Sequence, residues 1–113
     1  MITDFSFGKI VVNGKTYCDD IKIVREQVIP DWWRRSGHRV DVEDIADILE
    51  SGPDIVIIGK GSPGLMKTGT RLRERMVANN IVLIEKKTSK AIEVFNKLFQ
   101  EGRNVAAGFH ITC

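Results

Sequence analysis

The chain has 113 residues, a length that supports one domain over residues 1–113 and leaves no room for a second hydrophobic core. Hydrophobic residues make up 42% of the chain and charged residues 28%, a balance typical of folded globular proteins and not of disordered chains. The formal net charge of +2 is too small to indicate a nucleic acid or a membrane as a partner.

The cysteine content and the N-terminus indicate a compartment. Two cysteines, Cys18 and Cys113, are too few for the disulfide framework of a small secreted domain, and their spacing matches no zinc motif. Residues 1–5 lack the features of a signal peptide, and the longest apolar run, 55–58, is far too short to span a membrane. We therefore expect a cytoplasmic protein that needs no metal and no cofactor.

Residues 5–23 are predicted to form a β-hairpin. Asn13 and Gly14 at its centre are typical of a two-residue type I′ turn, because both central residues of that turn need a positive φ. The following residues, 28–38, have neither helical nor strand periodicity and are interrupted by Pro30 and Gly37. We expect an irregular segment there, with room for an edge strand.

An amphipathic helix is predicted from residue 42. Its apolar positions follow the helical period, and four acids are expected on the opposite, solvent-facing side: Glu43, Asp44, Asp47 and Glu50. Asp41 is the expected N-cap, and Gly52 with Pro53 should end the helix.

Strands and helices alternate in the rest of the chain. The β-branched run 55–58 is typical of a strand buried on both faces, and the run 81–84 predicts a second buried strand. The other expected elements are a glycine-rich loop over 59–69, a helix over 70–77, a helix from 89 to Gly102 and a last strand over 105–111. This order predicts an α/β fold in which a mostly parallel central sheet is covered by helices on both faces, with the N-terminal hairpin added to it.

Residues 59–64, Gly-Lys-Gly-Ser-Pro-Gly, match the pattern G-x-G-x-x-G directly after a predicted strand. Such a loop can bring backbone N–H groups close to a pyrophosphate, and Glu85 follows the next strand, where a ribose-binding acid would be needed. Against a dinucleotide site, Pro63 removes one N–H and the helix starts only near Thr70. A P-loop fits less well, because the motif is not followed by lysine and a hydroxyl residue.

Two interpretations of Gly59, Lys60 and Gly61 therefore stay open. The first is a surface loop that owes its shape to glycine, and the second is a binding site for a small anion.

Residues 32–39 place two aromatic side chains beside several basic ones. Such a composition suits a hot spot for a protein partner, a cation–π stack or an anion pocket. One of Trp32 and Trp33 can belong to the core, and the other is a candidate for a partly exposed binding residue. We select Trp33, Arg34 and His38 as candidate binding residues.

The chain ends in His110-Ile-Thr-Cys113, which could suggest a nucleophile and its base. On an extended strand His110 and Cys113 point to opposite faces, so we predict no catalytic pair here. A pair between His110 and His38 would need the tertiary structure to bring them together. His110 is kept as a candidate binding residue, and no catalytic residue and no metal site are predicted.

The chain resembles the family of small Mth938-like domains, its adipogenesis-associated members in particular. The residues that carry the resemblance are Phe7, Gly8, Lys9 and Tyr17; Trp33, Arg34, Gly37 and His38; Ile57 to Gly61 with Leu65, Met66 and Lys67; Thr88, Ala91, Phe95, Asn96, Leu98 and Gly102; and Gly108 to Cys113. The resemblance implies a three-layer α/β/α sandwich. It implies no reaction, because the family has no established catalytic residues or cofactor and the roles suggested for its relatives concern the assembly and regulation of other proteins.

Two functional hypotheses follow. The first is a non-enzymatic module for protein binding, assembly or regulation, which uses the segment of Trp33, Arg34 and His38 together with the Gly59–Gly61 loop. The alternative is a protein, with or without enzymatic activity, that binds a small molecule, an anion or a nucleotide in a pocket at Gly59-Lys60-Gly61. An unknown protein is the expected partner, an anionic small molecule is the other, and a homo-oligomer is left open.

The charges are unevenly distributed along the chain. Between Asp41 and Asp54 there are six acids and no base, whereas between Lys60 and Lys90 there are eight bases and two acids. Two solvated helix faces explain these blocks most simply. If the protein attracts an anionic ligand or an acidic partner, we expect it on the Lys60–Lys90 side.

Overall fold

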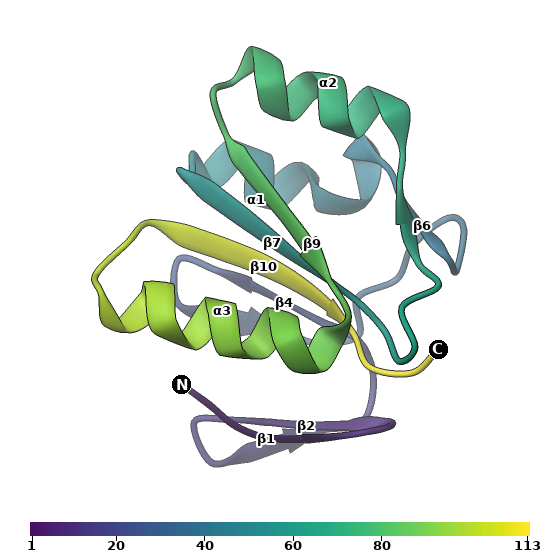
Figure 1. Cartoon of the computed structure of the whole chain (residues 1–113), viewed down its shortest axis with the longest axis vertical. Helices are drawn as coiled ribbons and strands as arrows, with labels where there is room; N and C mark the ends of the chain where they lie inside the picture. Colours follow the sequence, from purple (N-terminus) through teal and green to yellow (C-terminus); the bar gives the residue numbers. More distant parts are fainter.

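The structure is a computed structural model that describes residues 1–113 (Figure 1). The strands are β1 (Ile2–Ser6), β2 (Lys9–Val12), β3 (Lys15–Tyr17), β4 (Ile21–Val24), β5 (Gln27–Ile29), β6 (Arg39–Val40), β7 (Ile55–Lys60), β8 (Lys67–Thr68), β9 (Val82–Lys86) and β10 (Val105–His110). The helices are the 3-10 helix η1 (Val42–Ile45), α1 (Ala46–Ser51), α2 (Thr70–Ala78) and α3 (Thr88–Gln100). The strands form a central sheet in the order β5-β4-β10-β7-β9, an N-terminal sheet in the order β1-β2-β3, and the pair β6-β8.

The N-terminal sheet is antiparallel and turns at the predicted position. Asn13 and Gly14, between β2 and β3, have φ values of 50° and 82°, which confirms a turn with two positive φ angles. The predicted hairpin over residues 5–23 is wrong in its extent. A further strand, β1, begins at Ile2 and pairs with β2, and the strand after the turn ends at Tyr17.

β4 leaves the N-terminal sheet and joins the central one, although it was expected in the hairpin. Ile21 and Ile23 are fully buried, and β4 pairs antiparallel with β10 and with β5. β5 is an edge strand of the central sheet, and it overlaps the start of the segment 28–38, in which an edge strand was left open. Because two of the four pairings are antiparallel, the central sheet is mixed and not mostly parallel.

β10 and β9 occupy unexpected places in this sheet. β10, the last strand, lies between β4 and β7, runs parallel to β7, and has all of its residues buried. β9 lies at the edge, where Val82 is 56% exposed, so the prediction of a second buried strand is wrong. An apolar run does not reveal whether a strand has a neighbour on one side or on both, because that depends on pairings distant in the sequence.

Apolar side chains of the central sheet pack on both of its faces. In β7, Ile55 and Ile57 point toward α3 and the N-terminal sheet, while Val56 and Ile58 point toward η1, α1 and α2. Figure 1 shows α3 and the α1–α2 pair on different sides of the strands. The fold is therefore mixed α/β, and one of its faces is covered by a second sheet as well as by a helix.

The first predicted helix begins as a 3-10 helix and continues as α1. Asp41 precedes it with an extended backbone, and Gly52 ends it with a φ of 68°, as predicted. Asp44 was expected on the solvent side but is buried. Its carboxylate accepts hydrogen bonds from the N–H groups of Asp41 and Arg35, because the tighter 3-10 turn directs this side chain toward the chain that precedes the helix.

The segment predicted as a glycine-rich loop, 59–69, contains parts of two strands. Gly59 and Lys60 complete β7, and Lys67 and Thr68 form β8, which pairs in parallel with β6. α2 and α3 lie within one or two residues of their predicted positions.

Candidate functional site

Asp20, Arg34 and His110 meet at one end of the central sheet. Asp20 stands just before β4, and His110 is the last residue of β10. The antiparallel register pairs Ile21 with Phe109, which places Asp20 beside His110. The backbone N–H of Trp32 donates to the Asp20 carbonyl over 2.8 Å and so holds the segment of Arg34 against the same place.

The three side chains share one set of polar contacts. Asp20 Oδ2 lies 2.8 Å from His110 Nδ1 and 2.8 Å from Arg34 Nη2, and Asp20 Oδ1 accepts the N–H of Ile111 over 2.8 Å. Arg34 Nη2 also donates to the Gly37 carbonyl over 2.9 Å. A carboxylate only accepts hydrogen bonds, so Nδ1 of His110 carries a hydrogen and Nε2 is the basic nitrogen of the neutral ring.

Burial makes this cluster electrostatically strong. The side chains of Arg34 and His110 are only 5% and 8% exposed. Burial by itself raises the pKa of Asp20, but the hydrogen bonds from His110, from the Ile111 N–H and from Arg34 together lower it by more, so the net pKa lies below its ordinary value. Asp20 is therefore the anion that balances the buried Arg34 guanidinium.

Trp32 closes the cluster on one side. Its ring lies 4.5 Å from the guanidinium carbon of Arg34, and its Nε1 donates to the Asp44 carbonyl over 2.9 Å. Gly108 in β10 leaves the room for this ring, because a Cβ on Gly108 would lie 2.6 Å from Trp32 Cη2. The buried tryptophan of the pair is thus Trp32, and Trp33 is 75% exposed.

The glycines of the G-x-G-x-x-G segment serve contacts within the chain. A Cβ on Gly59 would lie 2.8 Å from Phe109, and one on Gly61 would lie 2.5 Å from the Thr112 carbonyl. The Gly61 N–H donates to the Thr88 hydroxyl over 2.8 Å, and that hydroxyl donates to the His110 carbonyl. The Ser62 N–H donates to the Thr112 carbonyl over 2.8 Å. The N–H groups of Gly61 and Ser62 are therefore not free to hold a phosphate.

The predicted site residues are brought together only in part. Arg34 and His110 join the buried cluster, and the ring of His38 lies edge to face with that of His110 at 5.7 Å between centroids. Gly59 and Gly61 are buried and Lys60 is half-buried. These last three residues line none of the five surface hollows described here, and a binding site at Gly59-Lys60-Gly61 stays a prediction.

Three exposed apolar side chains belong to segments that approach the C-terminal residues Ile111 and Thr112. Phe7 is 64% exposed, Trp33 75% and Leu65 55%. Their segments converge because the N–H of Gly8 donates to the Ile111 carbonyl, the N–H of Ser62 donates to the Thr112 carbonyl, and Trp33 lines a hollow of about 440 Å³ with both C-terminal residues. We call Phe7, Trp33 and Leu65 the C-terminal apolar surface.

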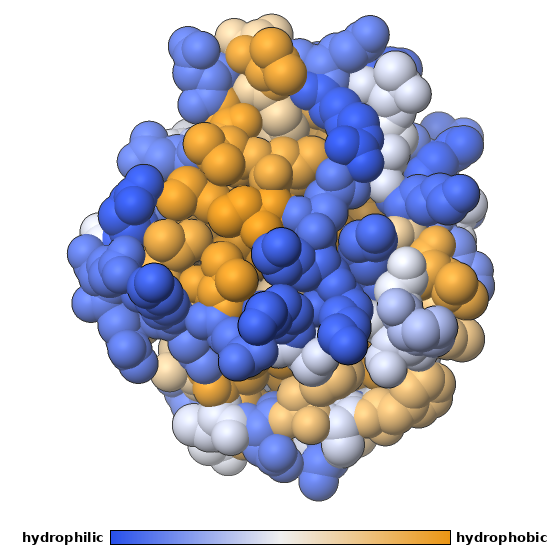
Figure 2. All heavy atoms as spheres, in the orientation of Figure 1, coloured by the Kyte–Doolittle hydropathy of each residue, from blue (hydrophilic) through white to orange (hydrophobic).

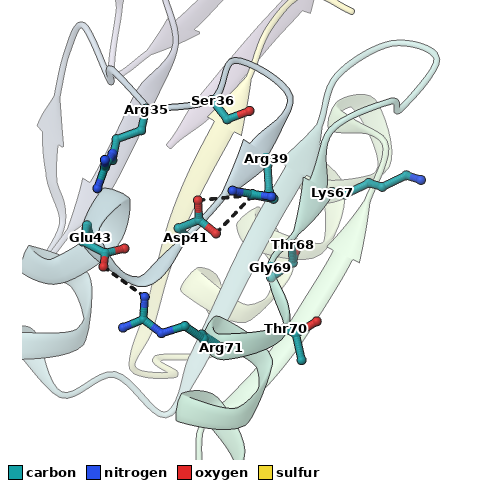
Figure 3. Close-up of a pocket in the computed structure, with 10 residues that line it drawn as sticks. All are labelled: Arg35, Ser36, Arg39, Asp41, Glu43, Lys67, Thr68, Gly69, Thr70 and Arg71. Atoms are coloured by element: carbon teal, nitrogen blue, oxygen red, sulfur yellow. Dashed lines mark hydrogen bonds and ion pairs between the residues drawn. The ribbon is translucent and has the colours of Figure 1, made fainter.

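A larger hollow, of about 780 Å³, lies between the β6–β8 pair and the start of α2. Ten residues line it, none of them hydrophobic: Arg35, Ser36, Arg39, Asp41, Glu43, Lys67, Thr68, Gly69, Thr70 and Arg71. In Figure 3 the side chains of Arg39 and Asp41 face each other, Arg71 faces Glu43, and the side chain of Lys67 extends away. The four basic residues had appeared in two separate stretches of sequence, and only the parallel β6–β8 pairing brings the stretches together.

The acidic and basic segments of the chain are neighbours in space. η1 packs against α2, and Arg71 Nη1 lies 3.2 Å from Glu43 Oε1. Hydrogen bonds from the Glu43 backbone N–H and from Arg71 lower the pKa of Glu43. Arg73 is likewise 2.8 Å from Glu85, the acid considered for a ribose, so the basic segment is partly neutralised.

The structure contains no cluster of three or more His, Cys, Asp or Glu side chains placed to hold a metal ion. Cys18 and Cys113 are both free and exposed. None of the helices has the length and apolar character needed to cross a membrane.

Known proteins resemble this chain over nearly its whole length. The family described as "Protein of unknown function (DUF498/DUF598)" matches residues 2–110. A solved structure named MT938 is 30% identical, with a TM-score of 0.80 over 100% of this chain and 98% of its own. A conserved hypothetical protein from Pyrococcus horikoshii OT3 is 22% identical, with a TM-score of 0.83 over 100% and 99% of the two chains. A protein from Bordetella pertussis, described as a Mth938-like domain, is 18% identical, with a TM-score of 0.67 over 97% and 84%.

Proposed function

The chain belongs to the DUF498/DUF598 family of Mth938-like domains, whose description names no function, and we propose that it is a non-enzymatic module that binds another protein. The binding site of this proposal is the C-terminal apolar surface. The observation that carries it is the 75% exposure of Trp33 beside a neighbour, Arg34, that is almost entirely buried. Tryptophan and other aromatic residues of this kind are enriched among the hot spots of protein interfaces.

The buried cluster supports this proposal by holding Trp33 in place. Trp32 and Arg34, on either side of Trp33, are anchored by the Asp44 carbonyl and by Asp20. An aromatic side chain held by such a backbone loses little conformational freedom when a partner covers it. Exposure of Trp33 is therefore better explained by binding than by a poorly packed core.

The chemistry of the cluster also favours binding over catalysis. Asp20 and Arg34 neutralise each other, and Nδ1 of His110 is engaged by the same carboxylate. A catalytic base must reach the proton that it takes, and the side chain of His110 is only 8% exposed. We assign Asp20, Arg34 and His110 to positioning the segment that carries Trp33.

Affinity capture from a lysate of the source organism tests this function. The bait is the wild-type chain, a Trp33→Ala, Leu65→Ala double variant, or Val77→Ala as a control whose exposure, 77%, matches that of Trp33. We expect at least one protein to be retained by the wild type and the control and lost by the double variant. That protein, once purified, should bind the double variant about 30-fold more weakly, as expected for loss of about 2 kcal/mol at a hot spot. Equal retention of every protein by all three baits would contradict the proposal.

A second candidate function is the binding of a polyanionic small molecule in the hollow of Figure 3. Arg35, Arg39 and Arg71 line it without any apolar residue, and the N-terminus of α2 at Thr70 adds the positive end of a helix dipole. Arg39 and Arg71 each have an acidic partner, whereas Arg35 has none in the hollow. We prefer this hollow to the Gly59-Lys60-Gly61 loop as the place for the anion, because the N–H groups of Gly61 and Ser62 already donate within the chain.

Thermal unfolding with tripolyphosphate at low ionic strength tests the second function. A ligand at 100 times its dissociation constant should stabilise the fold by about 2.7 kcal/mol. We expect Arg35→Ala to lose most of this stabilisation and Lys97→Ala, on α3, to keep it. Lys67→Ala should have a smaller effect than Arg35→Ala, because the Lys67 side chain extends away in Figure 3. Absence of stabilisation at millimolar tripolyphosphate, or equal loss in all three variants, would rule this function out.

A further inference from the structure

β9 presents an unpaired edge of the central sheet. The Val82 N–H donates to the Asp54 carbonyl over 3.0 Å, so the backbone of Val82 faces β7. In a parallel pair, backbone groups that face one neighbour come from every second residue. Ile84 and Lys86 therefore face β7 as well, while the N–H and C=O groups of Leu83 and Glu85 face outward, where β9 has no neighbouring strand.

Apolar side chains surround this edge. Val82 is 56% exposed, Val77 at the end of α2 is 77% exposed, and Leu83 and Ile84 are half-buried. Figure 2 shows a continuous hydrophobic area between α2 and α3 on the face that carries β9, with hydrophilic atoms on both sides. Exposed apolar strand edges are normally covered in natural proteins, because they pair readily with other chains.

We propose that the β9 edge pairs with the β9 edge of a second copy of this chain, antiparallel and centred on Ile84. This inference is independent of the function proposed for the C-terminal apolar surface. In this register Leu83 of each copy lies opposite Glu85 of the other, and each such pair exchanges two backbone hydrogen bonds. The N–H and C=O groups of Leu83 and Glu85, four in each copy, are then all hydrogen-bonded.

Shifting the register by two residues in either direction leaves part of the edge unpaired. Centred on Leu83, the pairing sets Glu85 opposite Ile81, whose N–H already donates to the Met76 carbonyl over 2.9 Å. Centred on Glu85, it sets Leu83 opposite Lys87, which lies beyond the end of β9. The backbone therefore favours the register centred on Ile84.

The side chains complement each other in the same register. Val82 and Ile84 point to the α3 face, as Ile55 and Ile57 opposite them do. On that face Ile84 meets its own copy and Val82 meets Lys86, whose methylene chain can cover it. No like charges stand opposite each other, and the Glu85 carboxylate is already neutralised by Arg73.

The ends of the strand carry opposite charges. β9 begins beside Asp54 and ends at Lys86, which Lys87 follows. An antiparallel arrangement brings the basic end of each copy toward the acidic end of the other, whereas a parallel arrangement would place equal charges together. Charge complementarity thus points to a second copy in antiparallel orientation as the occupant.

Closure of the assembly also favours pairing of the β9 edge with the β9 edge of a second copy. A two-fold axis through Ile84 uses both β9 edges, so the assembly stops at two copies, whereas a contact between the β9 edge of one copy and the β5 edge of the next would leave edges open for continued growth. The outer edges of the resulting ten-stranded sheet would be the β5 strands, which have only three residues and are followed by Pro30. Such short edges resist further pairing.

Sedimentation equilibrium of the full chain tests the proposal with two variants at one position. Val82→Lys places a lysine opposite Lys86 of the other copy at both ends of the interface, and Val82→Glu places a carboxylate there. We expect a wild-type dimer, an increase of about tenfold or more in the dissociation constant for Val82→Lys, and a dimer for Val82→Glu. Thr16→Lys, at an exposed position of β3 outside the patch, should stay dimeric.

Amide hydrogen exchange provides a second measurement that does not depend on the variants. The Leu83 and Glu85 N–H groups should exchange slowly at high protein concentration and faster on dilution below the dissociation constant, while β10 amides keep their protection. A wild-type chain that is still monomeric at a protein concentration of about 100 times a micromolar dissociation constant overturns the proposal. So does a dimer that survives Val82→Lys unchanged or that dissociates with Thr16→Lys.

Discussion

Asp20 and His110 are 90 residues apart in the chain, and yet Asp20 Oδ2 lies 2.8 Å from His110 Nδ1. The contact exists because β4 pairs antiparallel with β10, so that the residue before one strand lies beside the last residue of the other. Arg34 completes the cluster through the same carboxylate oxygen. The predictions below concern this cluster and the contacts that support it.

Replacing Asp20 by asparagine should make the free energy of unfolding less dependent on pH in the acidic range. The folded-state pKa of Asp20 lies below its ordinary value of about 3.8, so its contribution is complete above that pH and is lost as the pH falls through the folded-state pKa. At pH 7 Asp20→Asn should cost about 3 kcal/mol, because Arg34 stays buried without its anion.

Urea unfolding at neutral and acidic pH measures this difference. The gap in unfolding free energy between wild type and Asp20→Asn should narrow as the pH falls below the ordinary carboxyl range, whereas Asp4→Asn, at an exposed position, should leave the wild-type pH profile unchanged. A gap that stays constant over the whole range would show that Asp20 does not act through its charge.

Gly108→Ala should destabilise the fold through Trp32. The added Cβ would lie 2.6 Å from Cη2 and 2.7 Å from Cζ3 of that ring, and relieving such an overlap costs about 1–3 kcal/mol. Gly37→Ala is the matched control, because its Cβ would meet nothing within 4 Å. Denaturant unfolding should also show a smaller effect of Gly108→Ala in a Trp32→Phe background. Additive effects of the two changes would mean that the ring is not the cause.

Thr88→Val should cost more stability than Thr88→Ser. The fully buried Thr88 hydroxyl accepts from the Gly61 N–H and donates to the His110 carbonyl, and valine would leave both groups unpaired at a cost of about 2 kcal/mol. Serine keeps both hydrogen bonds and loses only a methyl group, worth about 1 kcal/mol. Thermal unfolding of the two variants distinguishes them, and the opposite order would contradict the bridging role.

Asn96→Ala should loosen the N-terminal strand. The Asn96 side chain accepts the Ile2 N–H over 3.1 Å and donates to the Ile2 carbonyl over 2.7 Å, which ties β1 to α3. We expect a loss of about 1–2 kcal/mol and faster amide exchange in β1, with protection retained in β7 and β10. Unchanged exchange in β1 would show that the apolar contacts of Ile2 suffice to hold the strand.

Local sequence signals predicted the elements whose causes are local. The turn at Asn13 and Gly14, the helix stop at Gly52 and the two long helices depend on residues within a few positions of each other, and the structure agrees with them. The burial of β9 depended on its strand neighbours, and the orientation of Asp44 on a 3-10 turn that periodicity did not reveal.

The candidate site could be predicted only in its composition. Arg34, His38 and His110 were selected from the sequence, but Asp20 was not, because nothing near it distinguishes it from its neighbour Asp19. The pattern of Gly59 and Gly61 left both a surface loop and an anion site open, and in the structure these glycines make room for other parts of the same chain. A ligand loop and a close contact within the chain both require a residue without Cβ, so the glycine pattern does not distinguish the two.

The sequence by itself determined that this protein has an α/β fold, where its turns and long helices lie, and to which family it belongs, since these depend on periodicity, on backbone conformation and on residues in a fixed order. The tertiary structure alone decided that β4 pairs with β10, that β9 is an edge, and that Asp20, Arg34 and His110 form one buried cluster. Strand pairing joins residues that are far apart in the chain, and the charge, burial and exposure of a side chain depend on which strands become neighbours.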